Sequence, residues 1–306
     1  MRRFLLWCAR NQWLRTHVPR LPGVRRAVRR FMPGETMEEA LTAGVALEAG
    51  GLPALYTRLG ENLTDRAQAD AVAAHYHALI DEIARLGHDG QISPKLTQLG
   101  LDLDPEATYA HCESLARHAH EAGSRFWIDM EDSSYVDRTL ELYQRLLGAQ
   151  PGAGVCLQAY LRRTPADVER LRPLGSAIRL VKGAYDEPAD RAFRARDDVA
   201  AAYRDLSLAM LPDAAAGRLT LALGTHDVEL VEDIARAGSM DGHGRDAFEV
   251  QMLYGIRADQ QRRMRAAGYR VRVLIAYGDY WYPWYVRRLA ERPANLWFAM
   301  RQLLPW

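Results

Sequence analysis

From residue 36 onward the chain repeats one pattern, an apolar run followed by a helix-like stretch and then a glycine or proline. Eight such runs occur, at residues 52–59, 88–99, 124–130, 154–161, 177–185, 218–224, 247–254 and 269–277. Short apolar runs of this kind are typical of parallel strands that are covered on both faces. Eight strand-and-helix units without a long structureless gap predict an α/β fold, a closed (βα)8 barrel of the TIM type.

An open doubly wound sheet is the alternative architecture. It would normally contain fewer units and a phosphate-binding glycine turn after its first strand. Residues 242–247 fit that glycine pattern loosely, but they precede an apolar run and open no helix. Helix boundaries are marked elsewhere by ordinary signals, with Thr64 as the expected N-cap of a helix over 64–86 that ends at Gly87.

Composition limits the function classes. The net charge of +1 over 306 residues disfavours a broad nucleic-acid-binding face. Three cysteines without paired spacing favour a reducing compartment, so we expect a cytoplasmic protein. His75 and His77, like His118 and His120, stand two apart on expected helices and do not share a face, so the sequence predicts no metal site.

The first 35 residues differ from the rest, because residues 1–34 contain nine arginines and no acid. We interpret residues 1–35 as a basic helical arm packed on a catalytic barrel of residues 36–306. A basic amphipathic helix of this kind also suits contact with the inner face of an anionic membrane. A targeting presequence is a third interpretation, but such segments are usually rich in serine, and the first serine here is Ser93.

Chemically active side chains follow the predicted strands, where the active site of such a barrel lies. Asp129 and Arg179 stand at the third and fifth strand ends, and Arg287 and Arg288 follow the eighth, with Glu291 one turn later. Cations outnumber the deep carboxylates, so we expect an anionic ligand held by charge-assisted hydrogen bonds of about 1.5–3 kcal/mol each. Other candidates at these strand ends are Lys95, Gln158, Lys182, Gly183, Tyr185, Thr225, His226 and Leu253.

Six of these segments, in register, resemble proline dehydrogenase in its short monofunctional form, from about residue 35 to the end. The segments are Ser93-x-Lys95-Leu96, Ile128-Asp129-Met130-Glu131, Leu157-Gln158-Ala159-Tyr160, Arg179-Leu180-Val181-Lys182-Gly183-Ala184-Tyr185, Thr225-His226 and Arg287-Arg288-x-x-Glu291. The resemblance implies a distorted (βα)8 barrel that holds FAD without a dinucleotide fold. It also implies oxidation of L-proline to 1-pyrroline-5-carboxylate, with electrons passed to a membrane quinone and the product to a separate dehydrogenase.

The resemblance further implies a role for each matching residue. Asp129 and Arg179 would form the catalytic pair. Residues expected to bind or surround the substrate are Lys95, Tyr185, Leu253, Leu274, Trp284, Arg287, Arg288 and Glu291. Residues expected to contact FAD are Met130, Gln158, Arg179, Val181, Lys182, Gly183, Ala184, Thr225 and His226.

Two positions depart from the family pattern, Leu274 and Trp284, each of which stands where a tyrosine is usual. Both reshape the pocket for the substrate ring, so a dehydrogenase of 4-hydroxyproline is the nearest alternative. Leucine offers a hydroxyl group no hydrogen-bond partner, which favours proline. A Schiff-base aldolase using Lys182 or Lys95 and a non-catalytic FAD- or proline-binding regulator are the alternatives from other classes.

Overall fold

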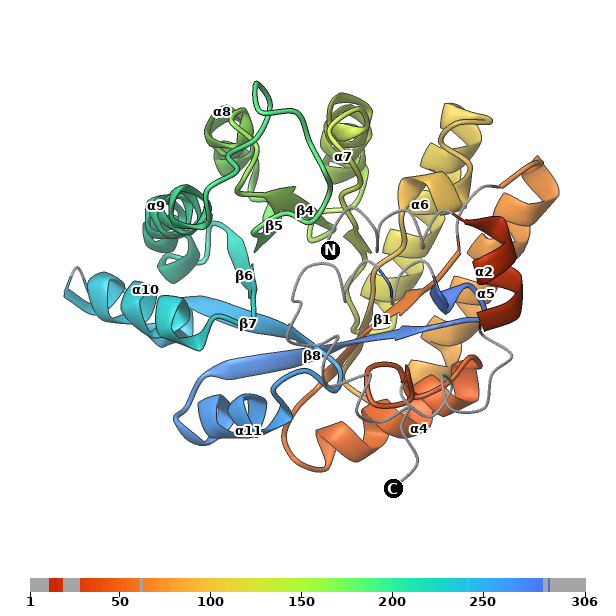
Figure 1. Cartoon of the computed structure of the whole chain (residues 1–306), viewed down its shortest axis with the longest axis horizontal. Helices are drawn as coiled ribbons and strands as arrows, with labels where there is room; N and C mark the ends of the chain where they lie inside the picture. Colours follow the sequence, from red (N-terminus) through yellow and green to blue (C-terminus); the bar gives the residue numbers. More distant parts are fainter. Residues whose placement is uncertain (1–10, 19–27, 61–62, 241, 283–285, 287–306) are drawn as a thin grey trace.

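The computed structural model describes residues 11–18, 28–60, 63–240, 242–282 and 286. Within these residues eight parallel strands form one sheet in the order β2-β1-β8-β7-β6-β5-β4-β3, and helices surround it (Figure 1). The strands are β1 Ala54–Arg58, β2 Gly90–Ile92, β3 Trp127–Ile128, β4 Gly154–Gln158, β5 Ala177–Val181, β6 Thr220–Gly224, β7 Phe248–Leu253 and β8 Arg270–Tyr277. Each of the eight predicted runs contains one of them, which confirms the predicted (βα)8 barrel.

The barrel is distorted between β2 and β3, the two ends of the strand order. These strands share no continuous ladder, and isolated parallel bridges join Ile92 to Phe126 and Lys95 to Asp129. β2 and β3 are also the shortest strands among the described residues, so the predicted run 88–99 is mostly loop and a 3-10 turn, η2 (Leu96–Leu99). The doubly wound alternative is wrong, because β8 pairs with both β1 and β7 in the middle of a nearly closed sheet.

Helices follow the strands, and the helix predicted over residues 64–86 ends at the expected glycine. The longest begins behind Asp65, whose carboxylate accepts from the Gln68 amide at 3.0 Å, and ends at Gly87 in the left-handed conformation. Thr64, the predicted N-cap, lies one residue too early. The helices are α2 Gln12–His17, α4 Met37–Glu48, α5 Arg66–Leu86, α6 Pro105–Glu121, α7 Val136–Ala149, α8 Thr164–Leu171, α9 Arg196–Ala215, α10 Val228–Met240 and α11 Ala258–Ala266.

Successive side chains along each strand point alternately toward the helices and into the barrel, so the protein has two separate buried regions. Outward-facing residues such as Tyr56 and Ile178 join the large apolar core under the helices. The inward-facing residues form a much smaller apolar group inside the barrel, Leu55, Trp127, Ala177 and Ala222, with Leu274 against it. Polar side chains also lie inside the barrel, and Arg179, Gln251 and Arg272 are all buried.

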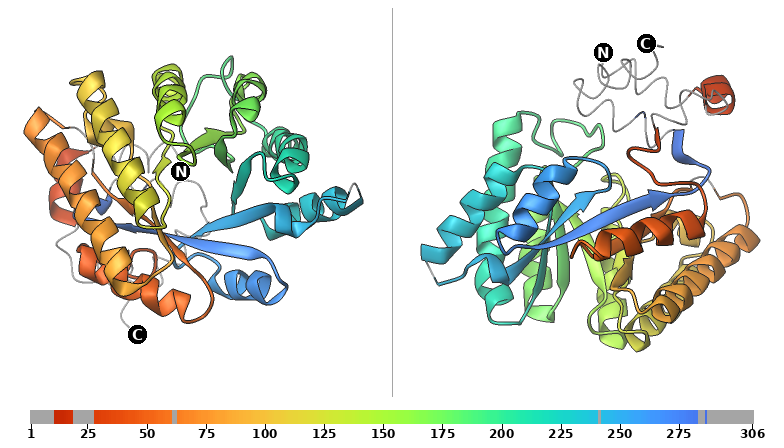
Figure 2. Two further views of the ribbon diagram at one scale, coloured as in Figure 1. Left: turned by 180° about the vertical axis from the view of Figure 1, so that it is seen from behind. Right: turned by 90° about the horizontal axis from the view of Figure 1, so that it is seen from below.

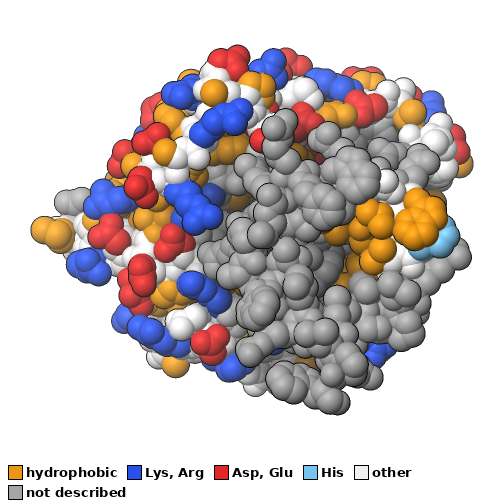
Figure 3. All heavy atoms as spheres, in the orientation of Figure 1, with side chains coloured by type: hydrophobic (Ala, Val, Ile, Leu, Met, Phe, Trp, Pro, Cys, Tyr) orange, Lys and Arg blue, Asp and Glu red, His pale blue; other side chains and the backbone are white. Residues whose placement is uncertain are grey.

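The described part of the N-terminal arm packs at the end of the barrel where β8 finishes, with α2 beyond that end (Figure 2). Val28 and Met32 are buried against Leu59 and Ala276, and the backbone approaches so closely that a Cβ on Gly255 would lie 1.6 Å from the Arg30 carbonyl oxygen. On the face in Figure 3, positive and negative side chains are interspersed over the described helices. Among the residues described, no helix is long and apolar enough to cross a membrane.

Candidate active site

Three side chains meet at the carboxyl end of the barrel, Ser93 after β2, Asp129 after β3 and Arg179 on β5. Arg179 donates from one terminal nitrogen to the Ser93 hydroxyl at 2.9 Å and to the Asp129 carboxylate, and Ser93 donates to Asp129 Oδ1 at 2.8 Å. Ser93 and Arg179 are buried, whereas Asp129 is partly open. The structure therefore brings together the predicted pair Asp129 and Arg179 and adds Ser93, a residue to which the sequence assigned no role.

The charge of Arg179 is stabilised by its neighbours. Burial opposes the charge, but the Asp129 carboxylate and the Cys156 side chain raise the pKa of Arg179 above its usual value. The guanidinium carbon also lies 5.4 Å from the ring centroid of Trp127, within the range of a cation–π interaction. Trp127 is itself held by a 2.7 Å hydrogen bond from its indole nitrogen to Gln91. The site thus contains a permanent cation with its anion, in a position fixed from several strands.

Lys95 lies beside this cluster because the β2 and β3 ends are joined. Lys95 and Asp129 form one of the parallel bridges, and the Asp129 amide donates to the Pro94 carbonyl at 2.9 Å. Glu131 accepts from the Thr97 amide at 3.2 Å and from its hydroxyl at 2.8 Å, which ties the loop after Lys95 to β3. Burial raises the pKa of Glu131, against the influence of the Lys95 charge. The Lys95 charge therefore lies close enough to the buried Glu131 carboxylate to act on it.

The end of β5 forms a half-buried rim. Gly183 has a φ of 108°, and a Cβ there would lie 2.1 Å from the ring of Tyr160, so glycine is required. Lys182 forms an ion pair with Asp227 at 2.6 Å, and burial of that carboxylate is outweighed by this contact, which lowers the pKa of Asp227. Asp227 also accepts from the Leu230 amide at 3.3 Å in α10. The rim residues from 182 to 185 are thereby tied to the neighbouring unit.

Polar groups at the carboxyl ends of β4 and β6, the strands on either side of β5, lie at the same end of the barrel. Gln158 at the end of β4 is 3% exposed, and its Oε1 has no hydrogen-bond partner among the described residues. Thr225 is buried after β6, and its hydroxyl accepts from the Asp227 amide at 3.1 Å. The imidazole of His226 accepts from the Leu253 amide at 3.3 Å. A buried amide oxygen without a donor is expected where a bound molecule supplies one.

The remaining predicted residues divide into two groups. Met130 is buried after β3, while Val181, Ala184, Tyr185, Leu253 and Leu274 are half-buried on the strands and ends that carry the cluster. Leu274 contacts both the apolar group inside the barrel and the group under the arm. Trp284, Arg287, Arg288 and Glu291 lie outside the described residues, so their predicted contacts remain predictions. The sequence places Gln251, like Ser93, at a strand end but gives it no role; in the structure it accepts from Arg179 at 3.4 Å, and its inward position two residues before Leu253 is the signal that would have indicated this.

Comparison with known proteins agrees with the sequence resemblance. A family model described as proline dehydrogenase matches residues 40–301. The chain is 34% identical to proline dehydrogenase 1 of Bacillus subtilis (strain 168) over 304 residues, or 99% of each chain. It is 38% identical to the proline dehydrogenase of Deinococcus radiodurans over 280 residues, 90% of this chain and 89% of that one.

Solved structures show the same fold. Proline utilization A from Bdellovibrio bacteriovorus superposes with a TM-score of 0.81 at 21% identity, covering 94% of this chain and 38% of the much longer other chain. Its counterpart from Corynebacterium freiburgense superposes with a TM-score of 0.75, covering 99% of this chain and 34% of that one. Since the family model and the full-length relatives agree, this chain belongs to the proline dehydrogenase family.

Proposed function

We propose that this protein is an FAD-dependent dehydrogenase that oxidises L-proline to 1-pyrroline-5-carboxylate. The observation that carries the proposal is the buried Arg179, held by Asp129 and Ser93 at the carboxyl end of a barrel whose sequence belongs to the proline dehydrogenase family. The relatives from Bacillus and Deinococcus are named for this activity and match this chain over nearly its full length.

The residues at the mouth fit a flavin. Gln158 offers a buried amide oxygen that lacks a donor, and an isoalloxazine ring carries an N–H group able to supply it. Gly183 lets the Tyr160 ring lie directly against the end of β5, which fixes the backbone of the rim beside Gln158. FAD would be held by Met130, Gln158, Arg179, Val181, Lys182, Gly183, Ala184, Thr225 and His226. When bound, flavin supplies the hydride acceptor that no side chain can provide.

The protein's own part in the reaction is to bind and orient the substrate. The proline carboxylate would pair with Lys95, Arg287 and Arg288, with Glu291 orienting the two arginines. Held in this way, the ring carbon next to nitrogen is presented to the cofactor, and fixed orientation accounts for much of such catalysis. Asp129 keeps Arg179 in place, and the cation stabilises negative charge that develops beside it. Tyr185, Leu253, Leu274 and Trp284 would enclose the ring.

Leu274 favours proline over 4-hydroxyproline. Its side chain packs against the apolar groups on both sides and offers no hydrogen-bond partner. A buried hydroxyl without a partner would cost about 1–3 kcal/mol, so we expect hydroxyproline to react at least about five times more slowly. A Schiff-base lyase that uses Lys182 is disfavoured because Lys182 is bound to Asp227 and is about one-third exposed, whereas an activated amine is usually desolvated.

Anaerobic titration of the purified protein tests the reaction. We expect flavin absorption bands that bleach with L-proline, respond weakly to trans-4-hydroxy-L-proline, and persist when Arg288→Ala is given the same modest proline concentration. A colourless protein, trapped by borohydride with a carbonyl substrate, would establish the lyase instead. Flavin bands that neither imino acid bleaches would refute the proposed reaction.

The electron acceptor and the location follow as parts of the same proposal. The reduced cofactor would pass electrons to a membrane quinone, and a separate pyrroline-5-carboxylate dehydrogenase would take the product. The protein would be cytoplasmic, with the basic arm in contact with the inner membrane face; the nine arginines of residues 1–34 and the 64% exposed Trp13 support this. Co-sedimentation with anionic vesicles, but not with neutral ones, and proline-dependent quinone reduction test both points.

A further inference from the structure

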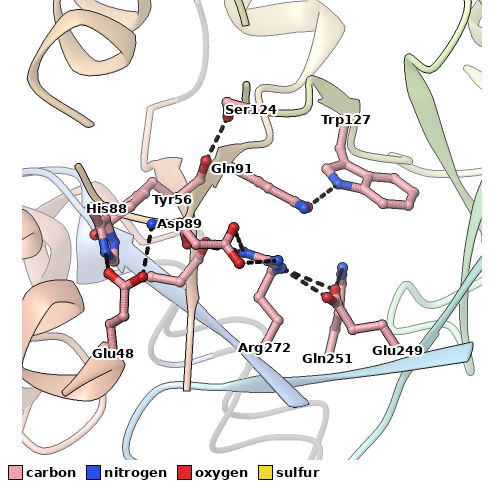
Figure 4. Close-up of polar contacts among 12 residues, drawn as sticks. Glu48, Tyr56, His88, Asp89, Gln91, Ser124, Trp127, Glu249, Gln251 and Arg272 are labelled. Atoms are coloured by element: carbon pink, nitrogen blue, oxygen red, sulfur yellow. Dashed lines mark hydrogen bonds and ion pairs between the residues drawn. The ribbon is translucent and has the colours of Figure 1, made fainter. Parts of the chain in front are cut away.

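A continuous line of polar side chains runs through the barrel from Arg179 to the opposite, amino-terminal end. Arg179 donates to Gln251 Oε1 at 3.4 Å, and Gln251 donates from Nε2 to Glu249 at 2.9 Å. Arg272 then donates from Nε to both Glu249 oxygens at 3.1 Å and reaches Asp89 through two terminal nitrogens at 3.0 and 3.2 Å. Figure 4 shows the part of this line from Gln251 to Asp89.

Strand alternation places these residues in one line. Gln251 and Glu249 are two apart on β7, so both point into the barrel, and Arg272 is the register partner of Gln251 on β8. Gln251 and Arg272 are 4% and 5% exposed, which leaves their polar groups dependent on one another. Charges alternate along the line, so every buried cation has an anion beside it.

The chemistry of Glu249 fixes the orientation of the Gln251 amide. An ionised carboxylate only accepts hydrogen bonds, so the NH₂ group of Gln251 must face Glu249. The carbonyl oxygen of the same amide is thereby turned toward Arg179, a group that only donates. With the amide reversed, both contacts would place donor against donor or acceptor against acceptor.

Arg272 makes this orientation permanent. Its guanidinium holds both oxygens of Glu249 and is anchored in turn by Asp89 and by the Ala54 carbonyl at 3.1 Å. Burial opposes its charge, but Glu249 and Asp89 raise the pKa of Arg272 above its usual value. Rotating the carboxylate of Glu249 away from Gln251 would therefore break its contacts with the buried Arg272 and leave that cation with Asp89 as its anion.

Arg179 is thus held on two sides. Ser93 and Asp129 take one terminal nitrogen from the β2 and β3 ends, and Gln251 takes the other from β7. A guanidinium is planar and rigid, so two fixed contacts define its plane. We propose that Glu249, acting through Gln251, is a positioning residue for Arg179 in the oxidation of proline, an inference that rests on the proposed function.

Glu249→Gln in the flavin-loaded enzyme tests this inference, because a neutral amide at 249 lets Gln251 adopt either orientation. We expect the limiting rate of flavin reduction by proline to fall about ten-fold, while the apparent dissociation constant of proline changes less than two-fold, since the proposed carboxylate ligands lie elsewhere. We also expect the reduction potential of the bound flavin to become more negative, because a loosened cation stabilises the anionic reduced form less.

Two further variants separate positioning from simple stability. Gln251→Met removes the amide and should lower the rate at least as much, and Glu249→Gln added to it should cause no further loss. Glu48→Gln is the matched control, since Glu48 contacts His88 and the Asp89 amide at the same barrel end but not Arg179 (Figure 4). It should reduce thermal stability without changing the rate or the potential.

The outcomes distinguish this inference from the proposed function. If Glu249→Gln and Gln251→Met keep the wild-type rate and potential, or if their effects add, Glu249 does not act through Gln251. If Glu249→Gln fails to fold, the rate and potential of Gln251→Met decide. If proline does not reduce the wild-type flavin, the proposed function is wrong, and the potential from a dithionite titration still tests the contact to Arg179.

Discussion

The ion pair between Asp129 and Arg179 should show strong coupling in stability. The side chains are 21% and 3% exposed, so Asp129→Ala leaves a buried cation with only neutral partners. Removing one member of a buried pair costs about 3–5 kcal/mol, and we expect about 3 kcal/mol here because Asp129 is partly open. For a chain of 306 residues the melting temperature should fall by about 5 °C.

A double-mutant cycle tests whether the cost arises from the unpaired charge. Arg179→Met alone should cost about 2–3 kcal/mol, but the double variant should cost about 3 kcal/mol, well below the sum, because no charge is left unpaired. The measurement is urea unfolding at a fixed excess of FAD. Flavin content is determined for each variant, so that stabilisation by the ligand can be subtracted.

An exposed ion pair provides the control for burial. Asp233 on α10 pairs with Arg204 at 2.6 Å, and both side chains are 39% exposed. Asp233→Ala should therefore cost less than about 1 kcal/mol. Additive effects of Asp129→Ala and Arg179→Met, or an equal loss in Asp233→Ala, would refute the argument from burial.

Three other variants test separate parts of the structure. Gly183→Ala should lose flavin and at least about 3 kcal/mol of stability, because the added Cβ would overlap the Tyr160 ring. Gly217→Ala is the control: its φ is 69° but no atom lies within 4 Å of the added Cβ, so it should lose only about 1–2 kcal/mol. Thermal unfolding measures both losses. Burial lowers the pKa of His75 from 6.5 to about 4, so between these pH values the unfolded chain binds a proton that the folded chain does not. The free energy of unfolding should therefore fall by about 1–2 kcal/mol as the pH drops from 6.5 to about 4, after allowance for partial exposure. His75→Gln should remove this pH dependence in urea unfolding measured across that range. If Lys182 contacts the cofactor, Lys182→Met should weaken flavin binding about ten-fold in a fluorescence titration. The loss of the partly exposed ion pair with Asp227 should lower the free energy of unfolding by less than about 1 kcal/mol.

The barrel could be predicted from the sequence because each buried parallel strand leaves a short apolar run, and helix-like stretches lie between the runs. The meeting of Asp129 and Arg179 could be predicted because both belong to predicted strand runs, and side chains toward the carboxyl ends of parallel strands lie on one side of the barrel. Chain position thus indicates which side chains share a site, without any knowledge of exact pairing.

Details that depend on strand register could not be predicted. Gln251 and Arg179 are 72 positions apart, and their contact requires the pairing of β5 through β7, which no local pattern specifies. The run 124–130 predicts a full strand, but the ladder contains Trp127 and Ile128 alone, because β3 lies at the distorted edge of the barrel. The N-cap at Asp65 was missed by one residue, since threonine and aspartate are comparable caps.

The polar interior explains why one end of the barrel can hold a rigid cation. Burying charges is costly compared with an apolar core of the same volume, so a line of alternating charges is a poor way to increase stability. It does make each side chain dependent on the next, from Asp89 at the open amino-terminal end to Arg179 at the mouth. The apolar group around Trp127 is small, so the polar side chains from Asp89 to Arg179 fit inside the barrel. The barrel interior is therefore less apolar than it could be, and in return the guanidinium of Arg179 is oriented before any ligand binds.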